Sequence, residues 1–322
     1  MATPGGRISE DGHGLELEAG QANGRTAEPG AAGARPLVSV ILLACNKAAY
    51  TERCLRGLLA TPYRPFEVVA VNNGSTDATG KLLDEYSARL SGAGIEVQRL
   101  YFERNVGAIV GRNEAMAKAR GEFIAFLDND VTPRTLSWMG RLVAFLRERR
   151  DVGVVGPRMI YPFPPHLIQC AGCEVSPTGR VSFLGRGEPR ESPEFGRERE
   201  CQALISACWM MPATAARVAG PLDEGYSPVQ FEDIDYCYRL REAGYKVVYL
   251  PSVEMYHFEN VTTGRTEGLN YKYLTVKNGL RFKNKWRRRF AREGGRPDAE
   301  MPWRYDLPTC KLEDIGELET VG

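Results

Sequence analysis

The sequence lacks the long hydrophobic runs of membrane-spanning proteins, since no apolar stretch approaches the roughly 18 residues that one span requires. It also lacks an excess of charge of one sign, because 42 lysines and arginines stand against 41 aspartates and glutamates. This balance argues against a dedicated nucleic-acid binder, which usually carries a basic excess. The first residues lack the basic start and apolar core of a secretory signal. These absences together predict a cytoplasmic protein.

Histidine is scarce, and the eight cysteines are scattered along the chain. A chain of this length does not need disulfide bonds to stabilise its core. Cys170 and Cys173 form a C-x-x-C pair, but a zinc site needs two more ligands, and Cys201 and Cys208 fit no familiar zinc-ribbon spacing. Buried free thiols are the preferred interpretation, and structural zinc is the alternative.

Two polar segments flank a central region in which strand and helix patterns alternate. Residues 1–35 are rich in Gly, Ala, Glu and Arg and contain few large apolar residues, which predicts a disordered tail. Residues 291–322 are polar and mixed, and they are interpreted as a C-terminal tail. The predicted domain spans residues 36–290, with a nucleotide-binding half at 36–131 and a smaller acceptor-binding half at 132–290.

Short apolar runs alternate with helical patterns in the first half. The apolar runs at 38–43, 67–71 and 123–127 and the more polar segment at 96–101 predict strands. Helices are predicted between them, the last from about Val110 to Arg120. This alternation predicts an α/β fold with a Rossmann-like, mostly parallel sheet and helices on both faces. Ligands bind beyond the carboxyl ends of the strands in such sheets. The polar residues at those ends are therefore the first candidates for chemistry.

The second half is less regular. Proline and glycine at 162–165 and 185–196 predict long loops. A helix is expected at 233–243, a strand at 246–250, and a basic helix at about 272–290.

Asp128-Asn129-Asp130 directly follows the apolar run at 123–127. Carboxylates two positions apart on an extended chain point the same way. Two oxygen ligands suit Mg²⁺ or Mn²⁺, which complete their coordination with water and substrate phosphates. A solvated acidic turn before Pro133 is the alternative interpretation.

Three acids, Glu232, Asp233 and Asp235, begin the predicted helix at 233–243. The helix dipole and the unpaired amides of a first turn favour acids there. Three acids within four residues exceed what a cap requires, so one of them is a candidate general base. His257 follows the next predicted strand and is a candidate ligand, although a lone histidine usually has a structural role.

These segments together resemble family 2 glycosyltransferases of the GT-A fold, over about residues 36–285 and in the family's order of motifs. The opening strand through Asn46-Lys47 looks like the family's nucleotide-contacting loop. Tyr256-His257 falls where many members place a metal-binding histidine. The other matching segments are V-N-N-G-S-T-D at 71–77, N-V-G at 105–107 with R-N at 112–113, G-E-F-I-A-F-L-D-N-D at 121–130, and E-D-I-D at 232–235 followed by A-G-Y at 243–245.

The resemblance implies an inverting, non-processive transferase that moves a sugar from a UDP-, dTDP- or GDP-linked donor to a glycan or lipid-linked acceptor. Asp128 and Asp130 would hold Mn²⁺ or Mg²⁺, with Asp130 the more direct ligand and His257 the third. Asp233 would be the base, and Glu232 would bind the acceptor or orient Asp233. The residues implied for donor binding are Ala44, Asn46, Asn72, Asn73, Ser75, Asn105, Gly107, Arg112, Asn113, Asp128 and Asn129.

Members similar to this chain often transfer rhamnose or a related sugar in surface polysaccharide or glycolipid assembly, an implication that rests on analogy alone. Processive members add membrane spans and a Q-x-x-R-W segment, and the sequence has neither. The family usually has aspartate at the position of Asn72, where an acidic oxygen accepts the imide proton of a pyrimidine. The preference for the donor base therefore stays open. Arg104 or Arg112 is a candidate for phosphate contact, and a surface ion pair is the alternative.

The basic segment at 283–290 has two interpretations. Aromatic residues among cations suit an anionic membrane surface, which would place the protein peripherally at the inner membrane face. Alternatively, the segment is a solvated helix end. Two other functions are also considered: a sugar-nucleotide-binding scaffold without catalysis, and a nucleotidyltransferase, whose glycine-rich signature after the first strand is missing here.

Overall fold

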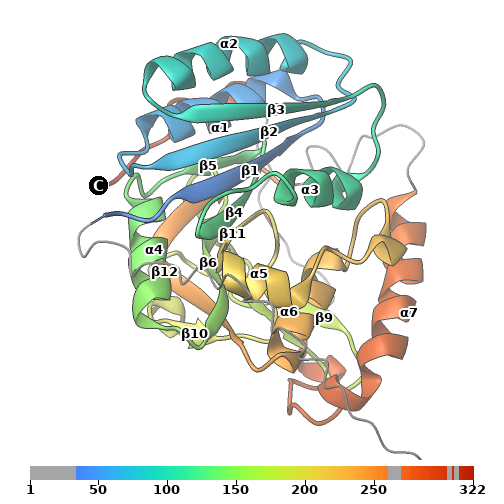
Figure 1. The fold of residues 1–322 in the computed structure, drawn as a ribbon. Helices are drawn as coiled ribbons and strands as arrows, with labels where there is room; N and C mark the ends of the chain where they lie inside the picture. Colours follow the sequence, from blue (N-terminus) through green and yellow to red (C-terminus); the bar gives the residue numbers. More distant parts are fainter. Residues whose placement is uncertain (1–33, 260–269, 303–306, 308–311) are drawn as a thin grey trace, which may run out of the picture. The chain divides into compact units, whose positions relative to one another are not determined.

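A mixed β-sheet runs through the part of the chain that the computed structural model describes, namely residues 34–259, 270–302, 307 and 312–322. Its strand order is β10-β12-β6-β11-β4-β1-β2-β3 (Figure 1). One half of this sheet is purely parallel, as the sequence predicts. Its strands are β1 (Val38–Ala44), β2 (Phe66–Asn73), β3 (Glu96–Phe102) and β4 (Phe123–Asp128).

Helices connect these parallel strands. α1 (Ala48–Ala60) joins β1 to β2, α2 (Thr79–Gly92) joins β2 to β3, and α3 (Ala108–Met116) lies between β3 and β4. Because such crossovers are right-handed and the strands are ordered β3-β2-β1-β4, α1 and α2 cover one face and α3 covers the other. The carboxyl ends of β1, β2 and β4 therefore meet at one edge of the sheet.

The second half of the sheet mixes strand directions. β11 (Cys208–Pro212) runs antiparallel to both β4 and β6 (Val152–Ile160), and β12 (Lys246–His257) runs parallel to β6. The sequence predicts only the first part of β12. The strand continues past an irregularity between Leu250 and Glu254, and it ends at His257.

The short strand β5 (Val131–Pro133) places the D-x-D segment beside the end of β12. It pairs antiparallel with β12, with Val131 opposite His257. The Phe258 amide also donates to the Asp130 carbonyl at 3.0 Å. The pairing therefore brings Asp130 and His257 together although they are far apart in the sequence.

One core joins the two halves of the sheet. The rings of Phe126, Trp209 and Tyr236 follow one another from β4 through β11 to α6, with centroids 5.4 and 5.8 Å apart. Around the second half lie α4 (Trp138–Glu148), α5 (Ala213–Ala219), α6 (Glu232–Glu242), α7 (Tyr271–Phe290), β7 (Ile168–Cys170), β8 (Cys173–Val175), β9 (Val181–Phe183), β10 (Arg199–Glu200), and the 3₁₀ turns Pro193–Phe195, Glu224–Tyr226, Asp298–Glu300 and Leu312–Asp314.

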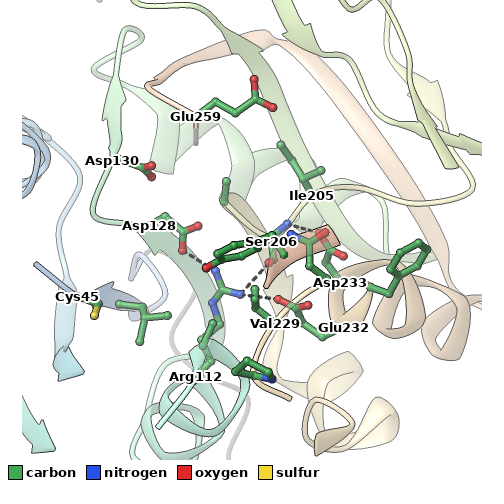
Figure 2. Close-up of a pocket in the computed structure, with 18 of the residues that line it drawn as sticks. Cys45, Arg112, Asp128, Asp130, Ile205, Ser206, Val229, Glu232, Asp233 and Glu259 are labelled. Carbon is green, nitrogen blue, oxygen red and sulfur yellow. Dashed lines mark hydrogen bonds and ion pairs between the residues drawn. The ribbon is translucent and has the colours of Figure 1, made fainter. Parts of the chain in front are cut away.

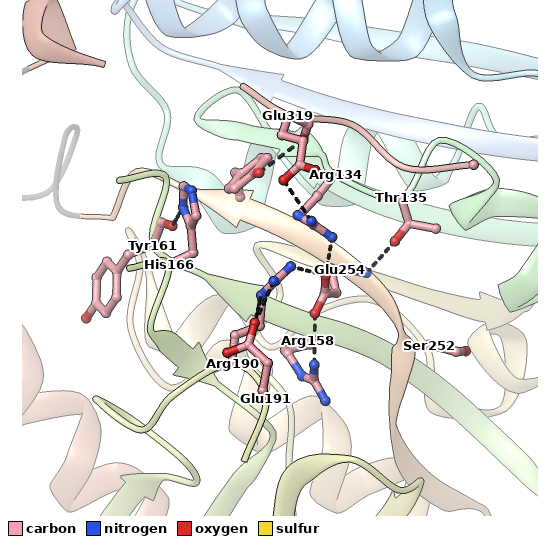
Figure 3. Close-up of polar contacts among 12 residues, drawn as sticks. Arg134, Thr135, Arg158, Tyr161, His166, Arg190, Glu191, Ser252, Glu254 and Glu319 are labelled. Carbon is pink, nitrogen blue, oxygen red and sulfur yellow. Dashed lines mark hydrogen bonds and ion pairs between the residues drawn. The ribbon is translucent and has the colours of Figure 1, made fainter. Parts of the chain in front are cut away.

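A buried cluster of charges anchors β12 (Figure 3). The Glu254 carboxylate lies 2.7 Å from the Arg134 guanidinium, 2.8 Å from that of Arg158 and 3.4 Å from that of Arg190. The Arg134 amide also donates to the Glu254 carbonyl at 3.1 Å. Because losing one partner would leave buried charges unpaired, the cluster fixes the part of β12 that carries His257.

α3 ends at Met116, before the Arg120 end that the helical pattern predicts. The Arg120 amide donates to Ser39 Oγ and to the Glu67 carboxylate, at 3.1 and 2.9 Å, and the Gly121 amide donates to Ser39 Oγ at 2.8 Å. These side chains on β1 and β2 take the amides that another helical turn would use.

The four cysteines considered for zinc are buried free thiols, and burial raises the pKa of Cys201 to about 12. No zinc-like grouping of His, Cys, Asp or Glu is present among the described residues. The predicted tail at 1–35 falls outside the described residues except for its last two. Part of the C-terminal tail is docked, because the Val321 amide donates to the Arg134 carbonyl at 2.7 Å. No helix in the described ranges is long and apolar enough to span a bilayer.

Candidate active site

A cavity of about 390 Å³ lies at the carboxyl ends of the parallel strands and reaches the first turn of α6 (Figure 2). Its polar wall combines residues from β2, α3, β4, α6 and β12. The wall therefore draws on both halves of the sheet. Most residues that the sequence singles out line it: Asn73, Asn105, Gly107, Arg112, Asp128, Asn129, Asp130, Glu232, Asp233 and His257.

Asn73, the last residue of β2, organises the loop before α3. Its Nδ2 donates to Asn105 Oδ1 at 3.0 Å, and its Oδ1 accepts from the Val106 amide at 2.9 Å. Gly107 immediately precedes α3 with a φ of 90°, and a Cβ there would lie 2.9 Å from Pro228. Only glycine meets both demands without strain, so the N-x-G pattern here reflects close packing of the loop against the segment before α6.

Asn46, Asn72 and Ser75 hold neighbouring loops together and lie outside the cavity wall. Asn46 Oδ1 accepts from the Thr76 amide at 2.7 Å, and the Asn46 amide donates to Ser75 Oγ at 2.8 Å. Asn72 Oδ1 accepts from the Ser75 amide at 3.0 Å, which closes the turn after β2. Both amide side chains thus use their oxygens within the protein.

Ala44, Asn113 and Arg104 also lie outside the wall. Ala44 is fully buried in β1. Asn113 exchanges two hydrogen bonds with the backbone of Leu222, at 3.0 and 2.8 Å, and thereby fixes the segment before η2 (Glu224–Tyr226). Arg104 is exposed. Donor contact through these residues stays a prediction.

Arg112 connects the two sides of the cavity (Figure 2). Its guanidinium lies 2.5 Å from Asp128 and 3.3 Å from Glu232, and it donates to Ser206 Oγ at 2.9 Å. The Arg112 side chain is only 4% exposed. Burial raises the pKa of Asp128, although the Arg112 charge opposes that rise. Arg112 is therefore a buried cation between two acids, rather than the surface ion pair that the sequence left as an alternative.

Asp130 and His257 form the other polar corner. His257 Nε2 lies 3.5 Å from Asp130 Oδ1, and both side chains are largely buried. On the far side of the ring, His257 Nδ1 lies 2.6 Å from Gln169 Oε1. Gln169 Nε2 donates to the His257 carbonyl at 3.3 Å, which fixes the orientation of this amide. Since Gln169 presents an acceptor, Nδ1 carries the proton, and in the neutral ring Nε2 keeps its lone pair toward Asp130.

This corner suits a divalent cation only in part. A carboxylate oxygen and an imidazole nitrogen face one another, and a partner on the other ring nitrogen is typical of metal-binding histidines. Asp128, however, is turned to Arg112. No three His, Cys, Asp or Glu side chains within the described ranges converge as a complete ligand set. Of the three predicted ligands, Asp130 and His257 thus face one another, and Asp128 is held by Arg112.

Glu232 and Asp233 occupy the first turn of α6 and face the cavity. Burial, together with the charge of Asp233, raises the pKa of Glu232 to about 8. Its Oε2 is buried and has no hydrogen-bond partner among the described residues. Burial also raises the pKa of Asp233, although its oxygens accept from the Ile234 amide at 2.8 Å and the Ser206 amide at 3.4 Å. The two acids differ in their contacts, because Asp233 accepts from two backbone amides and Glu232 Oε2 has no partner among the described residues.

Asp235, the third acid, is a structural anchor. It is fully buried and accepts from Tyr226, Arg239 and Trp286 at 3.1, 3.0 and 2.8 Å, and Lys285 Nζ lies 2.8 Å away. Trp286 and Lys285 belong to α7. Neither catalysis nor simple capping describes it, because it fastens α7 to α6.

Asn278 of α7 positions the segment that leads into α6, and nothing in the sequence marks it. It is fully buried, and its Nδ2 lies 2.6, 2.9 and 3.0 Å from the carbonyls of Tyr226, Val229 and Gln230. Phe231 follows with a φ of 70° and precedes the catalytic candidates. A buried amide thus holds a strained segment in register with the cavity.

The remaining wall is mostly apolar and comes from segments that the sequence leaves irregular. Glu259 is one of its polar members and lies 2.7 Å from Arg186. The others include Ser206, Gln230 and Thr275. This side offers apolar contact to whatever enters beside the acids. Its members are Val181, Phe183, Ile205, Val229, Phe231 and Tyr271.

Known proteins match this chain in sequence and in fold. The family model described as glycosyl transferase family 2 matches residues 39–172. An uncharacterized protein of Sinorhizobium fredii, y4gI, is 30% identical over 72% of this chain and 25% of its own length. The O-antigen biosynthesis protein RfbC of Myxococcus xanthus is 29% identical over 70% of this chain and 18% of its own length. This chain thus spans a quarter or less of these relatives.

The fold also has solved counterparts. A crystal structure of GalNAc-T7 with UDP, GalNAc and Mn²⁺ superposes with a TM-score of 0.64 at 18% identity, and it covers 79% of this chain and 50% of the other. That likeness shows the fold alone. Taken with the family match and the motif order, the chain belongs to glycosyltransferase family 2 and has the GT-A fold.

Proposed function

We propose that this chain transfers a sugar from a nucleotide-diphosphate donor to an acceptor hydroxyl, with inversion at the anomeric carbon. The observation that carries the proposal is the Asp128–Arg112–Glu232 link, which places strand-end acids and α6 acids in one cavity. A donor at the strand ends and an acceptor at α6 would meet there. The family membership supports the reaction class.

A divalent cation, Mn²⁺ or Mg²⁺, would neutralise charge on the departing nucleoside diphosphate. Asp130 and His257 would hold it, because they face one another and Gln169 orients the imidazole. Asp128 would join them once it leaves Arg112. The GalNAc-T7 structure contains Mn²⁺, which supports a divalent metal as the cofactor.

Asp233 would accept the proton of the attacking hydroxyl. Its raised pKa makes it a stronger base than an exposed aspartate, and its bonds to the Ile234 and Ser206 amides fix its direction. Glu232, protonated near neutral pH, would bind the acceptor through the unpartnered Oε2. An attack from the face opposite the leaving group inverts the anomeric centre.

The substrates follow from analogy and cavity chemistry. The UDP of the GalNAc-T7 structure supports a UDP-linked donor, with dTDP- and GDP-linked donors as alternatives. The name of the Myxococcus xanthus relative supports an acceptor in O-antigen assembly. A sugar such as rhamnose rests on family analogy alone. Since Asn72 caps a turn outside the wall, the missing aspartate there does not decide the base.

The test combines binding with turnover. The full chain is melted with UDP-, dTDP- and GDP-sugars, with and without Mn²⁺, and the best donor is then incubated with hydroxyl acceptors while nucleoside diphosphate release is measured. We expect a Mn²⁺-dependent rise in Tm, because a ligand of the folded state stabilises it. We also expect Mn²⁺-dependent release, and a product of inverted anomeric configuration by NMR.

Asp233→Asn is the diagnostic variant, and Asp84→Asn, at an exposed position on α2, is its control. Asp233→Asn should keep the rise in Tm and lose release by about 10²- to 10⁴-fold. Asp84→Asn should keep both. Donor binding without release from the wild type would favour the catalytically inactive scaffold, and an absent rise in Tm with every nucleotide would refute both functions.

A further inference from the structure

α7 has one buried and one exposed face. Every fourth residue turns inward, so Leu274, Asn278, Phe282 and Phe290 are buried and Trp286 packs against Tyr238. The opposite face exposes three large apolar side chains at the spacing of one helical stripe. They are Tyr273, Val276 and Leu280, with exposed fractions of 63, 62 and 57%.

Charge on α7 is entirely of one sign. Its sequence YKYLTVKNGLRFKNKWRRRF contains eight lysines and arginines and no acid. Arg281, Lys285 and Arg289 pair with acids of the domain. Four others, Lys272, Lys277, Arg287 and Arg288, are exposed, and no described carboxylate lies within ion-pair distance of them. Helical spacing places Lys277, Arg287 and Arg288 on the side of the apolar stripe.

The aromatic residues of the basic segment at 283–290 do not form this surface. Trp286 Nε1 donates to Asp235 at 2.8 Å, and Phe290 is 1% exposed. The sequence-based membrane interpretation relied on those rings, so the structure removes its basis there. The exposed apolar residues of α7 lie earlier in the helix, at 273–280.

We propose that the exposed face of α7 docks on an anionic membrane surface. Three apolar side chains on one exposed helix face can enter the interfacial region of a bilayer, and the neighbouring cations, which pair with no described carboxylate, match anionic headgroups. Because the whole chain has a formal charge of only +1, this cationic face is a local feature and no general property of the protein. An acidic soluble partner would match the cations but leave the apolar stripe unexplained.

The same helix contributes to the cavity. Tyr271 and Thr275 line it, and Asn278 holds the segment before Glu232. If the proposed transferase function holds, a docked α7 would bring the apolar part of the cavity wall close to the lipid surface. A lipid-linked acceptor then reaches Asp233 while its anchor stays in the bilayer.

Vesicle co-sedimentation tests the docking with the full chain. Vesicles of phosphatidylcholine alone are compared with vesicles that also contain phosphatidylglycerol, at low and high salt. We expect binding to the anionic vesicles only, weakened by salt. Each exposed cation should contribute about fivefold to the affinity, so Lys277→Gln with Arg287→Gln and Arg288→Gln should lose more than tenfold.

The triple variant Tyr273→Ser, Val276→Ser and Leu280→Ser tests the apolar stripe and should lose binding to a similar degree. Arg217→Gln with Val218→Ser is the matched control, because these exposed residues form a basic and apolar pair on α5. It should bind as the wild type does. Unchanged thermal unfolding of each variant checks the fold, because all the substituted positions are exposed.

Three results would overturn the proposal. The first is a wild type that does not bind anionic vesicles, and the second is α7 variants that bind like the control pair. The third is self-association without lipid that the Tyr273, Val276 and Leu280 variant abolishes. The last would assign the stripe to a second copy of this chain. Nucleoside diphosphate release with a water-soluble acceptor separates this proposal from the transferase proposal. The α7 variants should keep that release, whereas Asp233→Asn loses it and still sediments with the vesicles.

Discussion

The two halves of the domain build their parts of the cavity in different ways. In the parallel half of the sheet, Asn73 and Asp128 reach the cavity because parallel strands end at a common edge. In the second half, whose strands run in mixed directions, Glu232 and His257 arrive through long-range contacts with Arg112 and Gln169. Topology places the first set, whereas individual buried polar contacts place the second. Substitution of single polar partners should therefore separate the two halves.

Arg112→Met should have the largest effect, because Arg112 joins the halves. The variant leaves Asp128 and Glu232 without their shared cation, and breaking a buried pair costs about 3–5 kcal/mol. Urea unfolding measures the free energy of unfolding. Arg99→Met is the control, since both members of the Arg99–Asp84 pair are about half exposed and such pairs contribute about 0–1 kcal/mol. Equal losses in the two variants would contradict the bridging role of Arg112.

Asp130→Ala should come next, through lost metal affinity. If Asp130 binds the cation directly, its removal should exceed the tenfold to hundredfold loss typical of outer-shell partners. Calorimetric titration with Mn²⁺ measures the affinity. Asn129→Ala is the matched neighbour, because the Asn129 amide donates to the Asn46 carbonyl and to Thr51 Oγ1 at 2.9 and 2.8 Å. That variant should lose about 1–3 kcal/mol of stability and keep the metal, and the reverse pattern would remove Asp130 from the ligand set.

The sequence predicts the first half well. The runs that form β1, β2 and β4 are mostly apolar, and the order of the four parallel strands implies the position of the site. It misses β6 and β11, because glycine interrupts β6 and C-W-M-M-P in β11 has no strand periodicity. An antiparallel strand between two parallel ones also leaves no local signal.

The chemistry of the candidate site follows the same division. The acids are found because their types and spacing suit a metal and a base. Gln169 and Asn278 are missed, since a buried amide contributes through partners distant in the sequence, and composition does not indicate those partners. Asp235 looks equivalent to Asp233 in sequence, and only packing against Trp286 reveals its structural role.

Gln169→Ala should weaken Mn²⁺ binding by about tenfold to a hundredfold, as expected for a second-shell partner. Without the Oε1 acceptor, the proton on His257 Nδ1 is no longer held in place. Imidazole ¹⁵N chemical shifts of the metal-free protein report the tautomer directly, and the chain has only three histidines. Gln169→Glu, which keeps an acceptor, should retain the wild-type tautomer. A tautomer unchanged in Gln169→Ala would show that Gln169 does not position His257.

Glu232→Gln should change how stability depends on pH, and it tests the protonation state of Glu232. The Glu232 pKa is raised to about 8 in the folded protein, from 4.5 in its ordinary state. Between these values the unfolded chain ionises first, so the free energy of unfolding falls as pH rises, by at most about 1.4 kcal/mol per unit. The variant should lack this fall. Urea unfolding across roughly the titration window, from about pH 4 to about pH 8, measures it.

Asp223→Asn provides the opposite sign. Asp223 pairs with Arg281 and Lys285 and accepts from the Gly225 amide, and although burial opposes them, these contacts lower its pKa to about 2, below the ordinary 3.8. Its contribution is present above the ordinary value and is lost as pH falls toward 2. The free energy of unfolding that Asp223→Asn loses relative to the wild type should therefore shrink in acid. The free energy of unfolding that Glu232→Gln gains relative to the wild type also shrinks in acid, because wild-type Glu232 is then protonated in both the folded and the unfolded protein. Parallel pH profiles for Glu232→Gln and the wild type would mean that Glu232 is ionised in the folded protein, and it would then be a second candidate base beside Asp233.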